Sequence, residues 1–314
     1  MKLWLAPLHG ITQYTFRNCL IKNFSGINSA ITPFLPTQSF DKLNVKKWDD
    51  IWPSNNPNIE IIPQLMGNSA SDIVDTIRKV SDVYGYNHYN WNIGCPVNQI
   101  VRRKRGCGLM PYPDLVEDVI ETVCEKTDCH FSIKMRLGLH DFTESQVILN
   151  RIDKYPLDFI VIHPRLGEWQ YDNVPDLNAL DELLKITKHQ IIYSGDIVDV
   201  YSFNILQQRY PEINQWMLGR GVLQNPFLAE QILNIHPNDR YQDIKRFFDF
   251  YQDFIQSIKL KRNDRGVLVN LKELWHYFAI YFKLEIGELS TLLRENDLST
   301  FVALSNNYIQ NSVR

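Results

Sequence analysis

The stretch that decides the fold is "IEIIPQLMGNSASDIVDTIRKVSDVYGYNHYNWNIG", residues 59–94. It begins with an apolar, β-branched run (59–66) and ends with a second one (88–94), and the segment between them has a helical pattern. Ile73, Ile77 and Val80 share one face of a 3.6-residue period, and Ser69 or Ser71 can cap the first turn. A strand, a helix and a second strand in this order predict a parallel βαβ unit.

The same alternation recurs along the chain. Pro113 opens another helical segment, in which Leu115, Val119 and Val123 share a face. Eight apolar runs are separated by segments long enough for a helix, and they are 3–7, 30–34, 59–66, 88–94, 131–138, 159–165, 191–197 and 215–221. Eight such strands predict an α/β fold of the (β/α)8 type, the TIM barrel. A doubly wound open sheet competes with it, but that fold normally has a G-x-G-x-x-G loop after its first strand, and here the first run ends in APLHG.

From about Tyr241 the pattern is helical throughout. Residues 241–261 have a broad apolar stripe that includes Phe247 and Phe254, and residues 267–282 have another. We therefore predict two domains, a TIM-barrel catalytic domain over residues 1–240 and a small all-α helical bundle over residues 241–314.

The composition limits the function. A net charge of -3 over 314 residues argues against a protein that coats nucleic acid. Two basic clusters remain, and by themselves such runs are more often solvated faces; they are Arg102, Arg103, Lys104 and Arg105, and Lys259, Lys261, Arg262 and Arg265. Five cysteines without a CxxC pair indicate reduced thiols and no metal site. With no long apolar window and no secretory signal, we expect a cytoplasmic protein without a membrane span.

Polar residues stand where the eight runs end, and barrel enzymes build their sites at the carboxyl ends of the strands. The residues are Pro7, Leu8 and His9; Gln64; Asn92 with Cys95; Lys134 with Arg136; His163 with Arg165; Ser194, Gly195 and Asp196; and Gly219 with Arg220. Each has a structural explanation when taken alone, such as a core histidine with its hydrogen bonds satisfied. Their recurrence at seven strand ends predicts one shared site.

Several of these residues indicate a bound, phosphorylated ligand. Gly195 and residues 219–221 follow strands seven and eight, where barrels commonly bind phosphate through backbone N–H groups, and Arg220 adds a cation. Lys134 lies between apolar neighbours and should point into the barrel mouth, where it needs an anionic or electron-rich partner. A flavin ring is one such partner, with Gln64 and His163 as further donors, and a Schiff base with a carbonyl substrate is the alternative.

Two cysteines compete for a reactive role. Cys95 lies between Gly94 and Pro96 just beyond the fourth strand, so its thiol should face the same pocket as Lys134. Cys107 lies between two glycines in what reads as a flexible loop. We favour Cys95.

Seven segments over residues 1–230 form a set when taken together. They are LAPLHGITQYTFR, PQLMG, NIGCPVNQI, SIKMRLG, VIHPR, SGDI and MLGRGVLQNPFL. In these segments and in their order the chain resembles the tRNA-dihydrouridine synthases, FMN-dependent barrel reductases, and the helical tail matches the family's small RNA-binding domain. Leu8, His9 and Ser194 depart from the residues usual in the family, and the loop before Pro113 is shorter.

The resemblance implies roles for individual residues. Cys95 corresponds to the general acid, which protonates C5 of a uridine while hydride passes from N5 of reduced FMN to C6, and NADPH or NADH reduces the flavin again. The residues corresponding to FMN contacts are Pro7, Leu8, His9, Gln64, Lys134, His163, Ser194, Gly195, Asp196, Gly219 and Arg220. Asn92, Arg136 and Arg165 correspond to residues on the uracil side, and both basic clusters become candidate contacts to tRNA.

Two other functions stay open at this point. An FMN barrel acting on a free pyrimidine or enone would not need a basic helical tail. A non-catalytic RNA-binding barrel would not need polar strand ends. We expect a monomer with no obligate protein partner, and the motifs do not specify which uridine is reduced.

Overall fold

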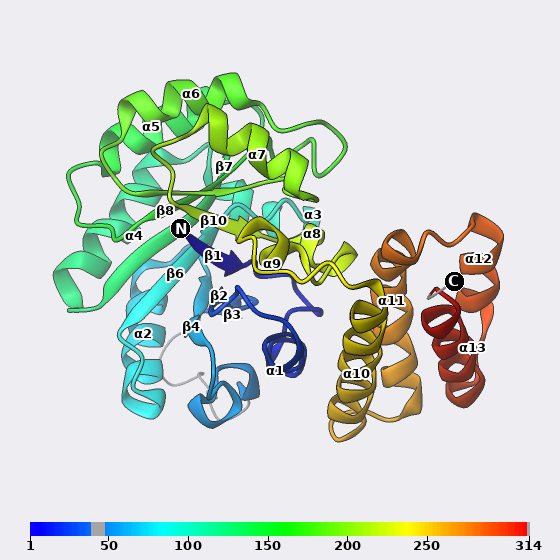
Figure 1. Cartoon of the computed structure of the whole chain (residues 1–314). Coiled ribbons are helices and arrows are strands. Elements are labelled where there is room, and N and C mark those ends of the chain that lie inside the picture. Colours follow the sequence, from blue (N-terminus) through cyan, green and yellow to red (C-terminus); the bar gives the residue numbers. More distant parts are fainter. Residues whose placement is uncertain (39–47, 313–314) are drawn as a thin grey trace.

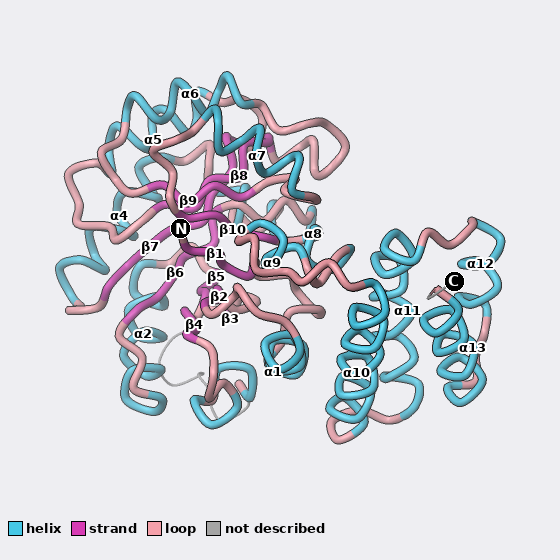
Figure 2. The backbone as a smooth tube through the Cα atoms, viewed as in Figure 1, coloured by secondary structure: helices cyan, strands magenta, loops and turns pink. Residues whose placement is uncertain are grey.

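The computed structural model describes residues 1–38 and 48–312. In these ranges ten strand segments form one parallel sheet (Figures 1 and 2). They are β1 (Lys2–Leu5), β2 (Ser29–Ile31), β3 (Leu35–Pro36), β4 (Glu60–Ile62), β5 (Gln64–Met66), β6 (His88–Ile93), β7 (His130–Gly138), β8 (Ile160–Leu166), β9 (Ile191–Ser194) and β10 (Gln215–Leu218).

The sheet closes into the predicted eight-stranded barrel. Strand β2 pairs with β4, and β3 pairs with β5. Only Pro63 separates β4 from β5, because proline has no N–H to donate to the ladder. The segments β2 and β3 therefore act as one barrel strand and β4 and β5 as the next. The ring then continues through β6, β7, β8, β9 and β10 and returns to β1, so both the fold class and the eight strand positions are confirmed.

Helices surround the barrel, as Figure 2 shows. They are α1 (Tyr14–Asn23), α2 (Ala70–Tyr84), α3 (Asn98–Val101), α4 (Pro113–Lys126), α5 (Thr143–Ile152), α6 (Leu177–Ile186), α7 (Val200–Arg209), α8 (Arg220–Gln224) and α9 (Leu228–Ile232), with the 3-10 turns η3 (Asp49–Ile51), η4 (Pro53–Asn55) and η5 (Gly106–Leu109). Of the two expected caps for α2, Ser69 is the one used, because its side chain accepts the N–H of Asp72. Helix α4 begins at Pro113 as predicted.

The barrel interior is apolar on one side and polar on the other. The apolar side is a cluster of Trp4, Ala6, Ile31, Ile62, Phe159, Val161, Ile192 and Met217. The polar side follows from the alternation of β7, which buries Ile133 and Met135 in the outer core and leaves Ser132, Lys134 and Arg136 on the opposite face. Polar side chains therefore line part of the barrel from its middle to its mouth.

The chain after the barrel is helical, as predicted. Residues 240–312 form α10 (Arg240–Lys259), α11 (Asp264–Phe282), α12 (Ile286–Arg294) and α13 (Leu298–Asn311), without a strand (Figure 1). Helix α10 packs on α1, with Phe16 edge-on to Phe250 and Phe254. Arg246 adds a bidentate pair with the buried Glu230, at 3.0 and 2.5 Å. In the described ranges no helix is both long and apolar enough to span a membrane.

Candidate active site

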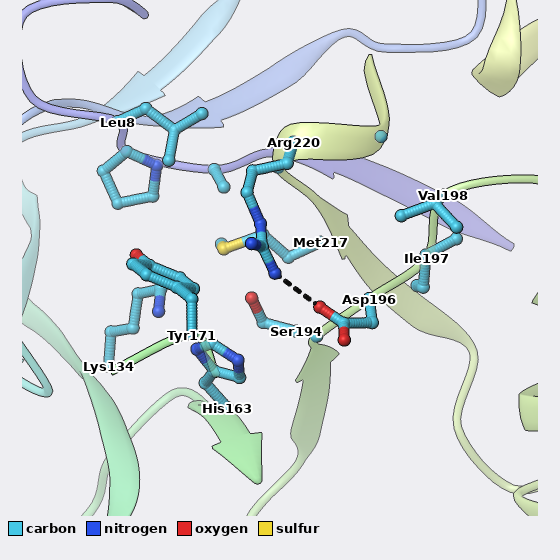
Figure 3. A pocket seen from close by; sticks show the side chains of 15 residues that line it. Leu8, Lys134, His163, Tyr171, Ser194, Asp196, Ile197, Val198, Met217 and Arg220 are labelled. Carbon is cyan, nitrogen blue, oxygen red and sulfur yellow. Dashed lines mark hydrogen bonds and ion pairs between the residues drawn. The ribbon is translucent and has the colours of Figure 1, made fainter. Parts of the chain in front are cut away.

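Two adjoining cavities open at the carboxyl ends of the strands. The first is lined mainly by the loops after β9 and β10, including Ser194, Gly195, Asp196, Gly219 and Arg220 (Figure 3). The second, of about 300 Å³, is lined by His9, Asn92, Cys95, Arg136 and residues around them. Both cavities are lined by Pro7, Leu8, Lys134, His163 and Tyr171. Most of the predicted strand-end residues thus converge on one composite site, as the barrel fold requires, whereas Gln64 and Arg165 line neither cavity.

Lys134 points into this site without a protein partner. Its side chain lines both cavities, and among the described residues its Nζ has no hydrogen bond or ion pair. Burial, together with the nearby guanidinium of Arg136, lowers the pKa of Lys134 to about 8. A desolvated ammonium without an acceptor from the protein can donate hydrogen bonds to an anionic or electron-rich ligand.

His163 and Arg165 are joined to Asp196 in a chain of contacts. Arg165 Nη1 lies 2.9 Å from His163 Nε2 and 2.9 Å from Asp196 Oδ1, and its Nη2 contacts Oδ2 of the same carboxylate. Arg220 donates to Asp196 at 2.7 Å. Burial would raise the pKa of Asp196, but the hydrogen bonds and charges of the two arginines bring it below its usual value. Burial, followed by the charges of the surrounding cations, lowers the pKa of His163 well below its ordinary value.

Cys95 is held at the edge of the second cavity by an amide network. Asn92 Oδ1 accepts the N–H groups of Gly94 and Cys95, at 3.1 and 2.9 Å. Asn92 in turn donates to Gln64 Oε1, and Gln64 donates to Asn90, both at 2.8 Å. Gln64 is fully buried and lines neither cavity, so in this structure its amide supports the turn that carries Cys95.

Cys107 has a different environment from Cys95. Instead of a flexible loop, it lies in η5, where its side chain is fully buried and its Sγ donates to Gly94 O at 3.1 Å. Burial raises its pKa to about 12. Burial also raises the pKa of Cys95, with Arg136 and Lys134 opposing the effect. At neutral pH both are thiols, but Cys95 is the one that lines a cavity.

Tyr171 is a site residue that sequence reasoning missed. Figure 3 shows its ring between Lys134 and Arg220. The guanidinium carbons of Arg136 and Arg220 lie 5.1 and 4.5 Å from the ring centre. Tyr171 belongs to an irregular segment after β8, where neither the 3.6-residue period of a helix nor the two-residue period of a strand predicts which side chains face the site. The one available signal was the pair of aromatic residues in GEWQYDN (167–173), directly after a polar strand end.

The helical bundle also reaches the site. Glu273 and Tyr277 of α11 line the second cavity, beside the barrel residues. Sequence reasoning missed both, because their position depends on the packing of α11 against α8. The wall of the second cavity therefore comes from both parts of the chain.

The two predicted basic clusters lie in different places. Lys261 and Arg262, after α10, line a third cavity of about 480 Å³ between bundle and barrel. His9 and Phe34 line this cavity and the second one, and their rings stack with centres 4.9 Å apart. Lys261 pairs with Asp49 at 3.1 Å, and both side chains are about half exposed. The cluster of residues 102–105 lies on the turn between α3 and η5 and lines none of these three cavities.

The fold and this site define the class of protein: an α/β barrel whose ligand cavities, at the carboxyl ends of the strands, are lined by cationic side chains. Comparisons with known proteins identify the family within that class. The sequence model of the Dihydrouridine synthase (Dus) family matches residues 4–288, and the chain belongs to that family, as the motifs predicted. A probable tRNA-dihydrouridine synthase of Helicobacter pylori is 27% identical over 240 residues, covering 74% of this chain and 70% of the relative. The tRNA-dihydrouridine synthase B of Pasteurella multocida is 26% identical over 242 residues, covering 72% of this chain and 67% of the relative.

Solved structures agree on the fold. Morphinone reductase in complex with tetrahydroNAD aligns with a TM-score of 0.52 at 10% identity, covering 76% of this chain and 88% of that one. The old yellow enzyme homologue from Zymomonas mobilis aligns with a TM-score of 0.50 at 12% identity, covering 75% and 89%. At such identities the similarity concerns the barrel alone.

Proposed function

We propose that this protein reduces the C5=C6 bond of uridines in tRNA to 5,6-dihydrouridine, with FMN as its bound cofactor and NADPH, or else NADH, as the reductant. Family membership supports the reaction, as do the names of the relatives. The observation that carries the proposal is that Cys95 and Lys134 line the same cavity, the second one, directly beside the first cavity with Arg220 at its wall. Among the described residues Lys134 has no partner that would compete with a ligand.

The residues present fit a flavin mononucleotide. We place its phosphate in the first cavity, near Arg220 and the backbone of Gly195 and Gly219. Lys134 and His163, which line both cavities, are placed to bind the polar edges of the ring. Pro7, Leu8, His9, Ser194 and Asp196 complete the proposed contacts. Tyr171 lines both cavities as well, so its ring would border the bound cofactor.

The geometry around Cys95 suits a proton donor. When reduced, the flavin supplies the hydride that adds to C6 of the uracil ring. Cys95 would deliver the proton to C5, and its raised pKa keeps the thiol protonated at neutral pH. Asn92 fixes the backbone of Cys95 and lines the same cavity together with Arg136, so both are proposed to contact the base. Arg165 lies one residue layer behind, against His163.

We also propose that the barrel and the helical bundle both contact the tRNA. A uridine in a folded tRNA must be extruded to enter a pocket, and contacts to the backbone and to neighbouring bases support that step. The third cavity offers both, with Lys261 and Arg262 for phosphate and the stacked pair of His9 and Phe34 at the passage to the second cavity. The proposed tRNA-binding domain is residues 241–314, and the cluster at residues 102–105 is a second candidate contact.

The test is direct. The purified protein should show a flavin spectrum and convert uridine in unmodified tRNA to dihydrouridine with NADPH. Cys95→Ala should keep flavin and NADPH oxidation but lose uridine reduction by about 10²–10⁴-fold, the usual contribution of a general acid. Cys107→Ala should keep both activities. A colourless protein, or NADPH turnover that leaves tRNA uridines unchanged, would contradict the proposal, and exchanged results for the two cysteines would reverse their assignment.

A barrel reductase of a free pyrimidine or enone is the second candidate. It is less well supported, because Glu273 and Tyr277 of the bundle form part of the wall of the second cavity. Efficient reduction of free uridine or UMP, with no preference for tRNA, would favour it. We propose that the enzyme works in the cytoplasm and as a monomer.

A further inference from the structure

We propose that Arg165, oriented by Asp196, acts as a positioning residue that holds His163 as a neutral imidazole with its proton on Nδ1. The site thereby offers this one N–H to its ligand. The assignment of the tautomer rests on contacts within the protein. Only the statement that the ligand receives the hydrogen bond rests on the proposed function.

The contact between Arg165 and His163 fixes the position of the proton. Arg165 Nη1 lies 2.9 Å from His163 Nε2, and a guanidinium has N–H donors but no acceptor. The contact is therefore a hydrogen bond only if Nε2 is unprotonated and accepts. A neutral imidazole with an accepting Nε2 has its proton on Nδ1.

The guanidinium cannot easily turn away from the imidazole. Nη1 and Nη2 form a fork on the carboxylate of Asp196, while Nε donates to the carbonyl oxygen of Asn173. The Arg165 side chain is only 2% exposed, so no bulk water competes for these donors. Asp196 is held from the other side by Arg220, and its backbone has a positive φ of 42°. These contacts determine which donor faces His163.

The charges around His163 reinforce the assignment. The cations acting on its ring are Lys134, Arg136, Arg165 and Arg220. The nearest carboxylate in the chain of contacts, Asp196, lies behind Arg165 and pairs with it. A proton added to Nε2 would point at a guanidinium and break the 2.9 Å hydrogen bond. The imidazolium form is therefore excluded by geometry as well as by charge.

The other ring nitrogen is available to a ligand. Among the described residues Nδ1 has no hydrogen-bond partner, and His163 lines both cavities. The Cδ2 edge of the ring faces Gly195, where an added Cβ would lie 3.2 Å from Cδ2. His163 therefore supplies a neutral donor next to the cationic Lys134. Neutrality matters, because a charged histidine would make ligand binding depend on pH near 6.5.

The decisive measurement is the ¹⁵N spectrum of histidine-labelled protein as purified, with the His163 signals assigned by their loss in His163→Gln. We expect a protonated Nδ1 and an unprotonated Nε2, unchanged from about pH 8 to about pH 5.5. A protonated Nε2 at pH 7, or titration of His163 within that range, would overturn the proposal. Because the spectrum does not depend on turnover, this result is independent of whether tRNA uridines are reduced.

Variants separate positioning from general structural support. Arg165→Met should give a mixture of tautomers and a titration midpoint that moves up towards about 6.5. Asp196→Asn should produce a smaller shift in the same direction, because the guanidinium keeps one acceptor and loses the charge that orients it. The matched control is Arg209→Met, which removes a guanidinium–carboxylate pair with Asp181 on the outer helices and should leave the His163 signals unchanged. Equal spectra in Arg165→Met and Arg209→Met would refute the role of Arg165.

Discussion

A side chain added at Gly106 should disturb the proposed general acid, because Gly106 lies directly against Cys95. It has a positive φ of 55°, and an added Cβ would lie 2.5 Å from the carbonyl oxygen of Cys95 and 2.9 Å from its Cβ. That carbonyl cannot swing aside freely, since it accepts the N–H of Cys107 at 2.9 Å. Gly106→Ala must therefore push the Cys95 turn and η5 apart.

The size of the effect follows from these distances. An ordinary contact begins at 3.4 Å, so the two segments must separate by about 0.9 Å. An alanine at positive φ costs about 1 kcal/mol, and the overpacking adds about 1–3 kcal/mol. The free energy of unfolding of Gly106→Ala should therefore fall by about 2–4 kcal/mol. A displacement of nearly 1 Å at the acid should slow uridine reduction by about 10²-fold.

The chain contains a matched control. Gly85 ends α2 at a positive φ of 76°, and an added Cβ there meets no atom within 4 Å. Gly85→Ala should lose about 1 kcal/mol of unfolding free energy and no uridine reduction. Equilibrium urea unfolding measures the first quantity, and dihydrouridine formed in tRNA measures the second. In both variants the rate of flavin reduction by NADPH should remain that of the wild type. If Gly106→Ala matched Gly85→Ala in stability and activity, the reasoning about the Cys95 turn would be wrong.

Two further predictions concern charge. The pKa of Lys134 is lowered to about 8, so its ammonium destabilises the flavin-free fold below that pH. At pH 7 the free energy of unfolding of Lys134→Met should therefore exceed that of the wild type by up to about 3 kcal/mol. This difference should shrink as pH rises from about 8 and vanish above about 10.5, where lysine becomes neutral also in the unfolded chain. A pH-independent difference in urea unfolding would contradict the prediction. Arg262→Ala should raise the KM for tRNA several-fold and reduce the salt slope of binding by about one. Arg209→Ala, at a residue that lines none of the three cavities described above, should do neither.

The sequence was sufficient for the parts of the site that follow from periodicity. Alternation along 131–138 places Lys134 and Arg136 on the inner face of β7, and both are found there. The ends of parallel strands meet at one face of a barrel, so the convergence of His163, Ser194 and Gly219 also followed from the eight runs. These inferences needed only the period of a strand and the closure of the sheet.

Features that depend on side-chain partners could not be predicted in this way. Arg165 was expected on the uracil side, but its donors are taken by Asp196, His163 and Asn173, residues that no local pattern connects to it. Gln64 was expected to contact the flavin, and its amide is engaged by Asn90 and Asn92. Both roles therefore remain predictions.

The distribution of charge explains how an acidic chain can serve an anionic ligand. Around the two cavities of the mouth the cations are Lys134, Arg136, Arg165 and Arg220, while Asp196 is paired with two of these arginines. The net charge of -3 is a sum over the whole chain, whereas these cations share one partly buried mouth, where screening by water is weaker. Net charge therefore says little about what this mouth can bind. A ligand that combines a phosphate with an electron-rich ring would relieve the repulsion among these cations, which is why we expect flavin to stabilise the folded protein.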